Sequence, residues 1–479
     1  MDWNRRLLIL LALGVGPLLA TAWAQERPVE AKLQAERGRA GPPHRMPPLV
    51  GVPTVDVVPG RPTDRSVRLV LLSHAADEQV TLRWWPASGT TEAALDRRIE
   101  LTGLEPVTVD LDGLRTDTAY RYELRRGPGS RGVLLTQGRF QTLRPTGSRF
   151  TVTLTADPHL DQNTDVPMLQ RTLALASADG PDFHIDLGDT FMVDKHADRE
   201  SAATQYLAQR HYFGQLGLPL FLVLGNHDGE DRKLMRDGAQ SLAVWANLQR
   251  KRYFPNPEPD AFYTGNETPD PWAGRLQDYY AWTWGDAQFI VLNPYWHAPT
   301  GRAPERWNLS LGVTQYAWLR QVLAASKSRY KFVFLHQLVG GIDRQGRGGA
   351  EAVPFGEWGG SNADGSPGMA AQRPGWPETV HELLRRTGVT AVFHGHDHLY
   401  AAQERDGIAY IETPQPGHRG AGHGQAGSDY GYRSGVVRGD GGYLRLRIGP
   451  EQCELDFIGT DGPQARVLHS TRLKARPQP

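Results

Sequence analysis

The chain of 479 residues contains one cysteine, Cys453, so no disulfide can form within it. Its stability must therefore come from packing and, where suitable side chains meet, from bound metal. Cys453 begins the segment 453–457, in which polar and apolar residues alternate as they do in a strand. We predict a buried structural thiol there rather than a nucleophile.

Net charge is absent as well. Lys and Arg together number 53, and Asp and Glu together number 53, so no overall field attracts nucleic acid or an anionic membrane. The glycine-rich stretch 340–349 is not followed by Gly-Lys-Ser/Thr and does not resemble a nucleotide-binding phosphate loop. Beyond residue 24, no apolar run reaches the roughly 20 residues that span a bilayer. We therefore expect neither a nucleic-acid partner nor a stable membrane span.

Residues 1–24 have the three parts of a secretory signal peptide. Arg5 and Arg6 precede an apolar stretch, residues 7–20, and Ala22-Trp23-Ala24 forms a cleavage site before Gln25. A membrane anchor is the alternative, but the apolar stretch is shorter than the roughly 20 residues of a span. We expect an exported protein, periplasmic or secreted.

The first part of the exported chain is predicted to be all-β. Residues 25–50 are rich in proline and charge and are interpreted as a tether or surface strap. Residues 51–146 then contain short alternating segments, which predict a sandwich: 67–72, 79–85, 107–111, 120–124 and 138–142. None of their residues looks catalytic. We expect a spacer or a wall beside the domain that follows, with carbohydrate or surface binding as the alternative.

From residue 149 to 460, apolar runs alternate with helical patterns, which is typical of an α/β domain. The predicted helices cover 166–177, 199–216, 231–250, 313–326 and 377–386. Segments 408–412, 443–448 and 453–457 return to strand patterns and suggest a second sheet. The predicted fold class is α/β (α+β overall), a two-sheet domain after an all-β sandwich, with residues 461–479 as a C-terminal tail.

Five apolar runs in this domain end in polar residues. The run 150–155 leads to Asp157 and His159, 183–187 to Gly188-Asp189, 219–224 to Gly225-Asn226-His227-Asp228, 330–335 to His336, and 391–394 to His396 and His398. Such runs fit strands buried on both faces of a parallel sheet, and the sites of open α/β sheets lie beyond the carboxyl ends of the strands. We therefore expect these side chains to meet at one edge. Their mixture of nitrogen and oxygen ligands suits Fe, Mn, Zn or Co better than Ca or Mg.

Taken in order, the five motifs resemble the calcineurin-like metallophosphoesterase family over residues 150–460. The resemblance implies two transition-metal ions. By the family pattern, the first is held by Asp157, His159, Asp189 and His398, and the second by Asp189, Asn226, His336 and His396. Asp189 bridges them, and two such cations can neutralise a phosphate and activate water. His227 would face the leaving group as a general acid.

The implied activity is hydrolysis of small phosphomonoesters by a metal-bound hydroxide. A phosphodiesterase acting on nucleotides or lipid head groups is one alternative. A binding protein that uses the metals only for stability is another, although His227, placed beside a ligand but outside the coordination set, argues against it.

Two departures from the family pattern matter. Many members continue the second motif as G-D-x-x-D-R-G, but Met192 stands where the second aspartate would be, so Asp194 and Asp228 both remain possible partners of His227. Residues 114–122 resemble the tyrosine corner of a fibronectin type III module, which precedes the catalytic domain in purple acid phosphatases. That branch has a tyrosine ligand where this chain has Phe191 and Met192, so no purple site is expected.

Other residues are further candidates for the site. Arg344 or Arg347, in the glycine-rich stretch 340–362, could contact phosphate or be solvated loop charges. Aromatic residues in 253–307 could line an apolar wall for the leaving group or pack in the core: Trp272, Trp282, Trp284, Tyr295 and Trp296. Gln415, Pro416, His418 and His423 are candidates for the rim of the site. His184 and His394 are predicted to be structural.

Overall fold

The computed structural model describes residues 44–475, apart from 52, 300–302, 343–345 and 421–426. The predicted signal peptide and most of the proline-rich segment lie outside the described residues. The chain divides into two units, and the second, residues 46–479, contains all the elements below. Among the described helices, none has the length and apolar character needed to cross a bilayer.

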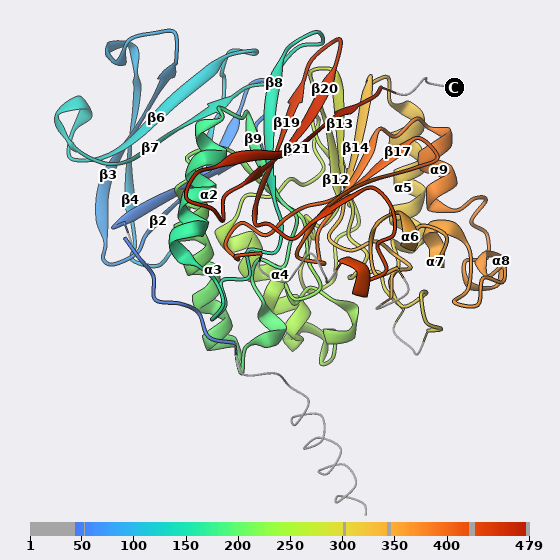
Figure 1. Cartoon of the computed structure of the whole chain (residues 1–479). Coiled ribbons are helices and arrows are strands. Elements are labelled where there is room, and N and C mark those ends of the chain that lie inside the picture. Colours follow the sequence, from blue (N-terminus) through green and yellow to red (C-terminus); the bar gives the residue numbers. More distant parts are fainter. Residues whose placement is uncertain (1–43, 52, 300–302, 343–345, 421–426, 476–479) are drawn as a thin grey trace, which may run out of the picture. The chain divides into compact units, whose positions relative to one another are not determined.

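The N-terminal module consists of two antiparallel sheets, blue to cyan in Figure 1. The first has the order β1-β2-β5: β1 (Val55–Gly60), β2 (Val67–Ser73) and β5 (Val107–Leu111). The second has the order β4-β3-β6-β7: β4 (Leu95–Leu101), β3 (Glu78–Pro86), β6 (Ala119–Arg126) and β7 (Val133–Gln141). Leu69, Leu82 and Leu124 are buried in the core of this module. The backbone N–H of Arg115 donates to the Tyr120 hydroxyl (2.9 Å) at the start of β6, forming a tyrosine corner. The strand order and the corner fit a fibronectin type III-like sandwich.

The remaining strands form two larger sheets. One has the order β10-β9-β8-β19-β20-β21: β10 (Leu220–Leu222), β9 (Phe183–Asp186), β8 (Phe150–Thr155), β19 (Gly442–Ile448), β20 (Cys453–Gly459) and β21 (Arg466–Leu473). The other has the order β11-β12-β13-β14-β15-β17-β16-β18: β11 (Thr264–Gly265), β12 (Tyr280–Trp284), β13 (Ala287–Val291), β14 (Tyr330–Phe334), β15 (Ala391–His394), β17 (Ile408–Glu412), β16 (Tyr400–Arg405) and β18 (Val436–Arg438). Strands β8, β9 and β10 are parallel, as are β13, β14, β15 and β17.

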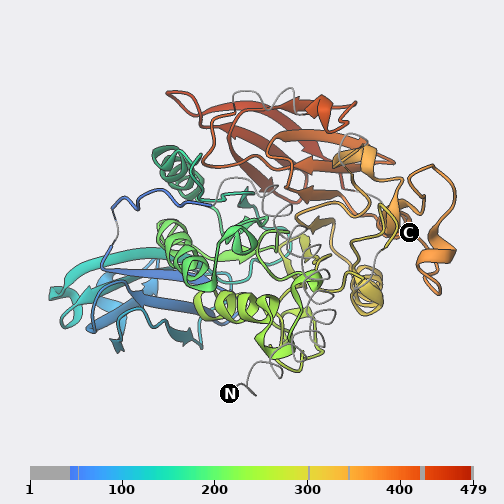
Figure 2. The same ribbon diagram turned by 90° about the horizontal axis from the view of Figure 1, so that it is seen from below.

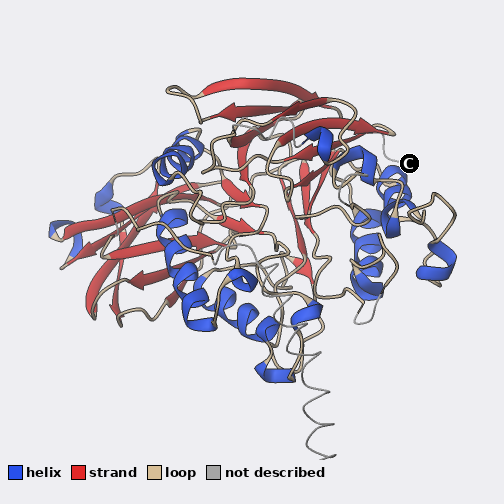
Figure 3. Ribbon diagram, turned by 60° about the horizontal axis from the view of Figure 1, so that its bottom comes forward, coloured by secondary structure: helices blue, strands red, loops and turns tan. Residues whose placement is uncertain are grey.

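These two sheets share one aromatic core. Phe183 of β9 packs against Phe289 of β13 (ring centroids 5.2 Å apart), and Tyr400 of β16 stacks on Phe457 of β20 (4.4 Å). Helices cover the outer faces (Figures 2 and 3). They are α2 (Val166–Ala178), α3 (Arg199–Gly214), α4 (Leu242–Tyr253), α5 (Gly312–Ala325), α6 (Gly349–Ala352), α7 (Gly356–Gly359), α8 (Met369–Gln372) and α9 (Val380–Arg386). The predicted two-sheet α/β fold is confirmed.

Two local expectations were wrong. The helix predicted over 231–250 begins only at Leu242, because Asp237 and Gly238 have positive φ angles (70° and 56°) that interrupt helical backbone. The segment before it forms two short 3₁₀ turns, Arg232–Leu234 and Gly238–Gln240. The expected C-terminal tail contains β21, which pairs antiparallel with β20. Its residues are mostly polar because it is an edge strand, so no apolar run marked it.

The N-terminal module is joined to the two-sheet domain through a buried arginine. Arg210 of α3 donates to the Asp56 carboxylate of β1 and to the carbonyl oxygen of Val70 (2.7 Å). Its side chain is 0% exposed and that of Asp56 is 3% exposed. Val58 and Leu72 of the module belong to the same apolar cluster as α3. The module is therefore part of the packed structure and not a loosely tethered domain.

Replacing Arg210 by methionine should destabilise the protein by about 3–5 kcal/mol, because Asp56 would keep a buried charge without its strongest partner. We expect a fall of roughly 5 °C or more in melting temperature. Arg121→Met, at an exposed position of β6, is the matched control and should change it little. Equal melting temperatures for the two variants would contradict this role of Arg210.

Candidate metal centre

The strand ends bring the predicted ligands together. Asp157, Asp189 and Asn226 follow the parallel strands β8, β9 and β10, while His336 and His396 follow β14 and β15 of the facing sheet. Among the described residues, three groups of potential ligand atoms result, each with its atoms within 4.8 Å of one another: Asp157, His159 and His398; Asp189, His336 and His396; and His159, Asp161 and His418. The first two groups contain six of the seven predicted ligands, and the seventh, Asn226, has its Oδ1 3.1 Å from His336 Nε2. The seven predicted ligands therefore meet at one place.

The first group faces inward around Asp157. Asp157 Oδ1 lies 3.6 Å from His159 Nε2 and 3.4 Å from His398 Nε2, while Oδ2 accepts a hydrogen bond from the backbone N–H of His396 (2.9 Å). Asp157 Oδ1 and His159 Nε2 are buried and have no hydrogen-bond partner among the described residues. Buried polar atoms are rarely left unpaired, so this pair marks a place for a cation.

The second group is arranged around His336. Its Nδ1 donates to the carbonyl oxygen of Leu187 (2.8 Å), which fixes the ring and directs Nε2 into the site. Nε2 lies 3.1 Å from Asn226 Oδ1 and 3.4 Å from Asp189 Oδ2. The rings of His336 and His396 are 5.3 Å apart. Four side chains thus surround one position.

Asp189 faces both groups. Its Oδ1 accepts a hydrogen bond from the backbone N–H of His227 (2.8 Å). Its Oδ2 is 3.8 Å from His159 Nε2 in the first group and 3.4 Å from His336 Nε2 in the second. Metal–ligand distances near 2.1 Å place the ligands of one ion about 3.0–3.5 Å apart. The observed spacings are close to that range, so the donor set fits two ions that share Asp189.

The electrostatics also favour positive charge at this position. Burial alone would raise the pKa of Asp157, but His336 and the contacts with His159 and His398 hold it well below its usual value. Burial opposes protonation of His159, yet Asp157 and Asp161 raise its pKa to about 10. Likewise, Asp189 and Asp157 raise the pKa of His336 to about 9 against the effect of burial. A cation bound here would provide the charge that these carboxylates attract.

The backbone is bent sharply at the ligands. Several of them have positive φ angles, which are uncommon for residues other than glycine: Asp157 (54°), His159 (40°), Asp189 (54°), His396 (84°) and His398 (59°). The strand-end glycines allow close approach, since a Cβ on Gly188 would lie 2.5 Å from Gly225 N. Backbone strain of this kind concentrates at functional sites.

His227 lies beside the centre, and its partner is now defined. His227 Nδ1 is 2.9 Å from Asp194 Oδ1, and the imidazole is 22% exposed. Asp228 instead accepts backbone hydrogen bonds from Asp189, Phe191 and Gly225. Burial and the charge of Asp189 raise the pKa of Asp228 to about 7. Of the two possible partners, Asp194 contacts the imidazole.

The remaining candidates lie in several places. Arg347 Nη2 lies 3.1 Å from His396 Nε2, and Gln415 Nε2 donates to the Asp157 carbonyl oxygen (3.0 Å). His418 Nε2 lies 3.4 Å from Asp161 Oδ1. Arg344 and His423 are outside the described residues. Pro416 is buried.

Asp161 also lies at the site, although the sequence motifs did not predict a role for it. Its Oδ2 is 3.7 Å from His159 Nδ1, on the side of the imidazole away from Asp157. A carboxylate in this position orients a metal-binding histidine. The spacing Asp157-x-His159-x-Asp161 is the signal that could have identified it.

Most of the aromatic and histidine candidates described in this paragraph lie away from the metal ligands and have structural contacts. Trp282 and Trp284 lie in the core between the sheets, whereas Trp272 is 48% exposed. Tyr295 is the exception, because its ring lies 6.4 Å from that of His336. His184 contacts the hydroxyls of Thr153 and Thr155 (2.9 Å each). Phe191 stacks on Tyr206 (4.2 Å) and points into the core.

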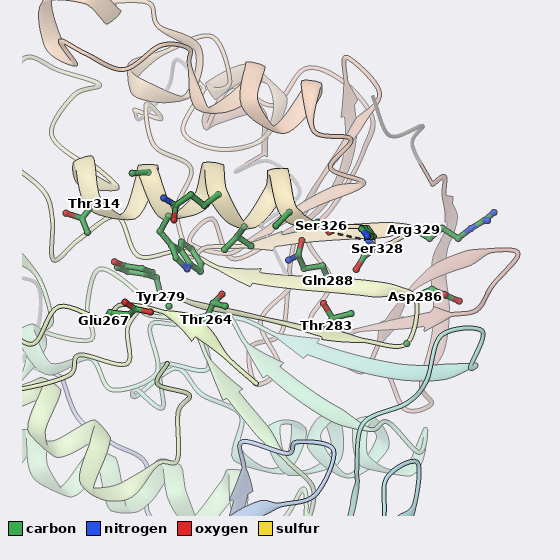
Figure 4. Close-up of a pocket in the computed structure, with 18 of the residues that line it drawn as sticks. Thr264, Glu267, Tyr279, Thr283, Asp286, Gln288, Thr314, Ser326, Ser328 and Arg329 are labelled. Carbon is green, nitrogen blue, oxygen red and sulfur yellow. Dashed lines mark hydrogen bonds between the residues drawn. The ribbon is translucent and has the colours of Figure 1, made fainter. Parts of the chain in front are cut away.

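A separate groove of about 1090 Å³ lies between α5 and the edge of the eight-stranded sheet (Figure 4). Thr264, Tyr279, Gln288 and Thr314 are among the residues that line it. None of the candidate metal ligands lines it, so the chemistry described above does not take place there.

A paired-sheet domain whose strand ends gather Asp, Asn and His around two cation positions defines a metallophosphoesterase. The family model described as calcineurin-like phosphoesterase matches residues 150–400 of this chain. The chain therefore belongs to that family, as the motifs predicted.

The chain is similar to tartrate-resistant acid phosphatase type 5 of Mus musculus, with 23% identity over 311 residues, covering 63% of this chain and 81% of that protein. The same enzyme of Oryctolagus cuniculus is 29% identical over 183 residues, which is 36% of this chain and 46% of that protein. A solved structure of PhoD has the same fold, with a TM-score of 0.61 at 16% identity, covering 90% of this chain and 92% of that one.

Proposed function

We propose that this protein is an exported dinuclear metal-dependent phosphatase that hydrolyses small phosphomonoesters. The observation that carries the proposal is the position of Asp189 Oδ2, 3.8 Å from His159 Nε2 and 3.4 Å from His336 Nε2, between two groups of ligands. The Mus musculus and Oryctolagus cuniculus relatives named above are acid phosphatases, which favours the monoesterase over the diesterase. Export rests on the motif in residues 1–24.

Each side chain has a role in this proposal. Asp157, His159, Asp189 and His398 hold the first ion, and Asp189, Asn226, His336 and His396 hold the second. When bound, two such ions neutralise the phosphate and activate a water molecule. Their identity is proposed only as Fe, Mn, Zn or Co, since the mixed nitrogen and oxygen ligands suit these metals.

His227 is proposed to donate the proton that the leaving oxygen needs. Its imidazole is partly exposed, so a substrate can reach it, and Asp194 holds Nδ1. The other ring nitrogen, Nε2, is then directed away from Asp194 and available to the leaving group. General acids of this kind contribute about 100- to 10,000-fold to rate.

Removal and return of metal tests the proposal. After chelation, hydrolysis of p-nitrophenyl phosphate should fall by at least about 100-fold, and added Mn²⁺ or Zn²⁺ should restore it. The same protein should hydrolyse bis(p-nitrophenyl) phosphate more slowly than the monoester.

The outcomes separate the alternatives. Faster hydrolysis of the bis ester would replace the phosphatase by a phosphodiesterase. Hydrolysis of neither compound at any metal content would favour a binding protein in which the metals only stabilise the fold. Activity that survives complete metal removal would contradict the dinuclear proposal directly.

A further inference from the structure

Asp397 stands between the two histidines of the last motif, His396 and His398, and is almost fully buried. Its Oδ2 accepts a hydrogen bond from the Tyr432 hydroxyl (2.7 Å), and its backbone N–H donates to Glu412 Oε1 (2.9 Å). Its Oδ1 forms an ion pair with Arg347 Nε (2.9 Å). Groups from three separate segments therefore fix the residue that connects two candidate ligands.

The guanidinium of Arg347 is held on several sides. It pairs with Asp397, approaches His396 Nε2 to 3.1 Å, and lies over the ring of Tyr430, with its carbon 4.4 Å from the ring centroid. The backbone N–H of Arg347 donates to the carbonyl oxygen of Tyr430 (2.9 Å). Its side chain is only 20% exposed. Arg347 is therefore held in one largely buried position by its contacts and is not a solvated loop charge.

The glycines beside Arg347 allow this approach. A Cβ on Gly348 would lie 2.5 Å from both Asp397 Oδ2 and the Tyr432 hydroxyl, and a Cβ on Gly349 would lie 2.0 Å from Gln403 Oε1. Gly349 also has a φ of +62°, which side chains disfavour. The backbone at these glycines therefore lies directly against the Asp397 carboxylate. This packing explains why both residues are glycine, and no contact with phosphate is needed to explain it.

We propose that Arg347 is a positioning residue for the second metal ion, acting through Asp397 to hold the loop that carries His396 and His398. The inference rests on the proposed dinuclear centre and adds to it a link between the glycine-rich loop and metal affinity. Partners outside the coordination sphere orient ligands, and their loss typically weakens metal binding about 10- to 100-fold.

If Arg347 acted only through its positive charge, it would weaken binding of the second metal ion instead of strengthening it. A guanidinium 3.1 Å from His396 Nε2 repels a cation bound by that histidine. The carboxylate of Asp397, paired with the same guanidinium, offsets that repulsion. Removing Arg347 would also leave a buried carboxylate without its cation, and the loop would rearrange to relieve this. The sign of the change in affinity therefore decides between positioning and simple repulsion.

The test is titration of chelator-treated full-length protein with Mn²⁺ by calorimetry. Wild type should bind two ions. Arg347→Gln should bind the second about 10- to 100-fold more weakly, with a smaller change for the first. Arg405→Gln is the matched control, because Arg405 donates to the carbonyl oxygen of Ala350 (3.2 Å) in the helix that follows the same loop. It should bind both ions as wild type does.

A double-mutant cycle identifies the partner. Once Asp397→Asn has removed the carboxylate, adding Arg347→Gln should weaken the second ion little further, because the two residues act as one unit. If Arg347→Gln does not fold, as judged by circular dichroism, Arg347→Lys decides, since an ammonium cannot reproduce the planar contacts to both Asp397 and His396. It should weaken the second ion as well.

Unchanged or tighter binding of the second ion by the Arg347 variants would overturn this inference. Additive effects of the two substitutions would also overturn it, because Arg347 would then act independently of Asp397. Wild-type protein that binds no Mn²⁺ would overturn the proposed metal centre instead, so the two failures are distinguishable.

Discussion

Asp189→Asn should lower kcat/KM for p-nitrophenyl phosphate by at least about 1000-fold, which is about 4 kcal/mol of transition-state stabilisation. In this structure Oδ1 accepts from the His227 N–H and Oδ2 faces both ligand groups. An asparagine oxygen that keeps the first contact turns the amide NH₂ toward the cation positions. The variant should therefore lose the bridge and hold fewer than two ions, measured by elemental analysis.

A matched control is available at the other end of the same strand. Asp182 is also buried and precedes β9, where it pairs with Arg144 (2.9 Å). Asp182→Asn should retain both ions and most of the activity, whatever it costs in stability. If Asp189→Asn kept two ions and wild-type turnover, the bridging role would be wrong.

His227→Ala should keep both ions and lose turnover according to the leaving group. For an alkyl phosphate such as glycerol 2-phosphate, we expect a fall of about 100- to 1000-fold in kcat, because an alkoxide needs a proton as it departs. For p-nitrophenyl phosphate the fall should be much smaller, since p-nitrophenolate leaves unprotonated. An equal loss on both substrates would show that His227 is not the acid.

Asp194→Asn tests the partner of His227. As with His227→Ala, kcat should fall more for the alkyl phosphate than for p-nitrophenyl phosphate, but both falls should be smaller. The imidazole remains and loses only its contact with the carboxylate (2.9 Å). Asp198→Asn, at the cap of the next helix, is a nearby control that does not contact His227. Wild-type kinetics for Asp194→Asn on the alkyl phosphate would remove Asp194 from the mechanism.

The two-sheet fold and the candidate ligands could be predicted because their signals are local. A buried strand requires a continuous apolar run, and the residue that follows it leaves the sheet at a defined edge. Asp157, Asp189 and Asn226 follow such runs in one sheet, and His336 and His396 follow them in the other. The rule for parallel strands gathers each set at the edge of its own sheet, and the packing of the two sheets brings the sets together. The resemblance to a family then divided them between two ions.

The contacts around those ligands could not be predicted from the local sequence pattern. Asp194 and Asp228 are both close to the motif, and only the path of the short turn Val193–Lys195 brings the first to His227. The sequence therefore left the partner open, and only the packed structure distinguished the two.

What the sequence by itself determined is the set of strands and the polar side chains at their ends, because apolar periodicity and strand-end position are properties of neighbouring residues. Only the tertiary structure decided the partners: Asp194 with His227, and Arg347 with Asp397. The last pair is 50 residues apart along the chain. Such contacts depend on how loops pack after the sheets have formed, and no local pattern encodes that distance.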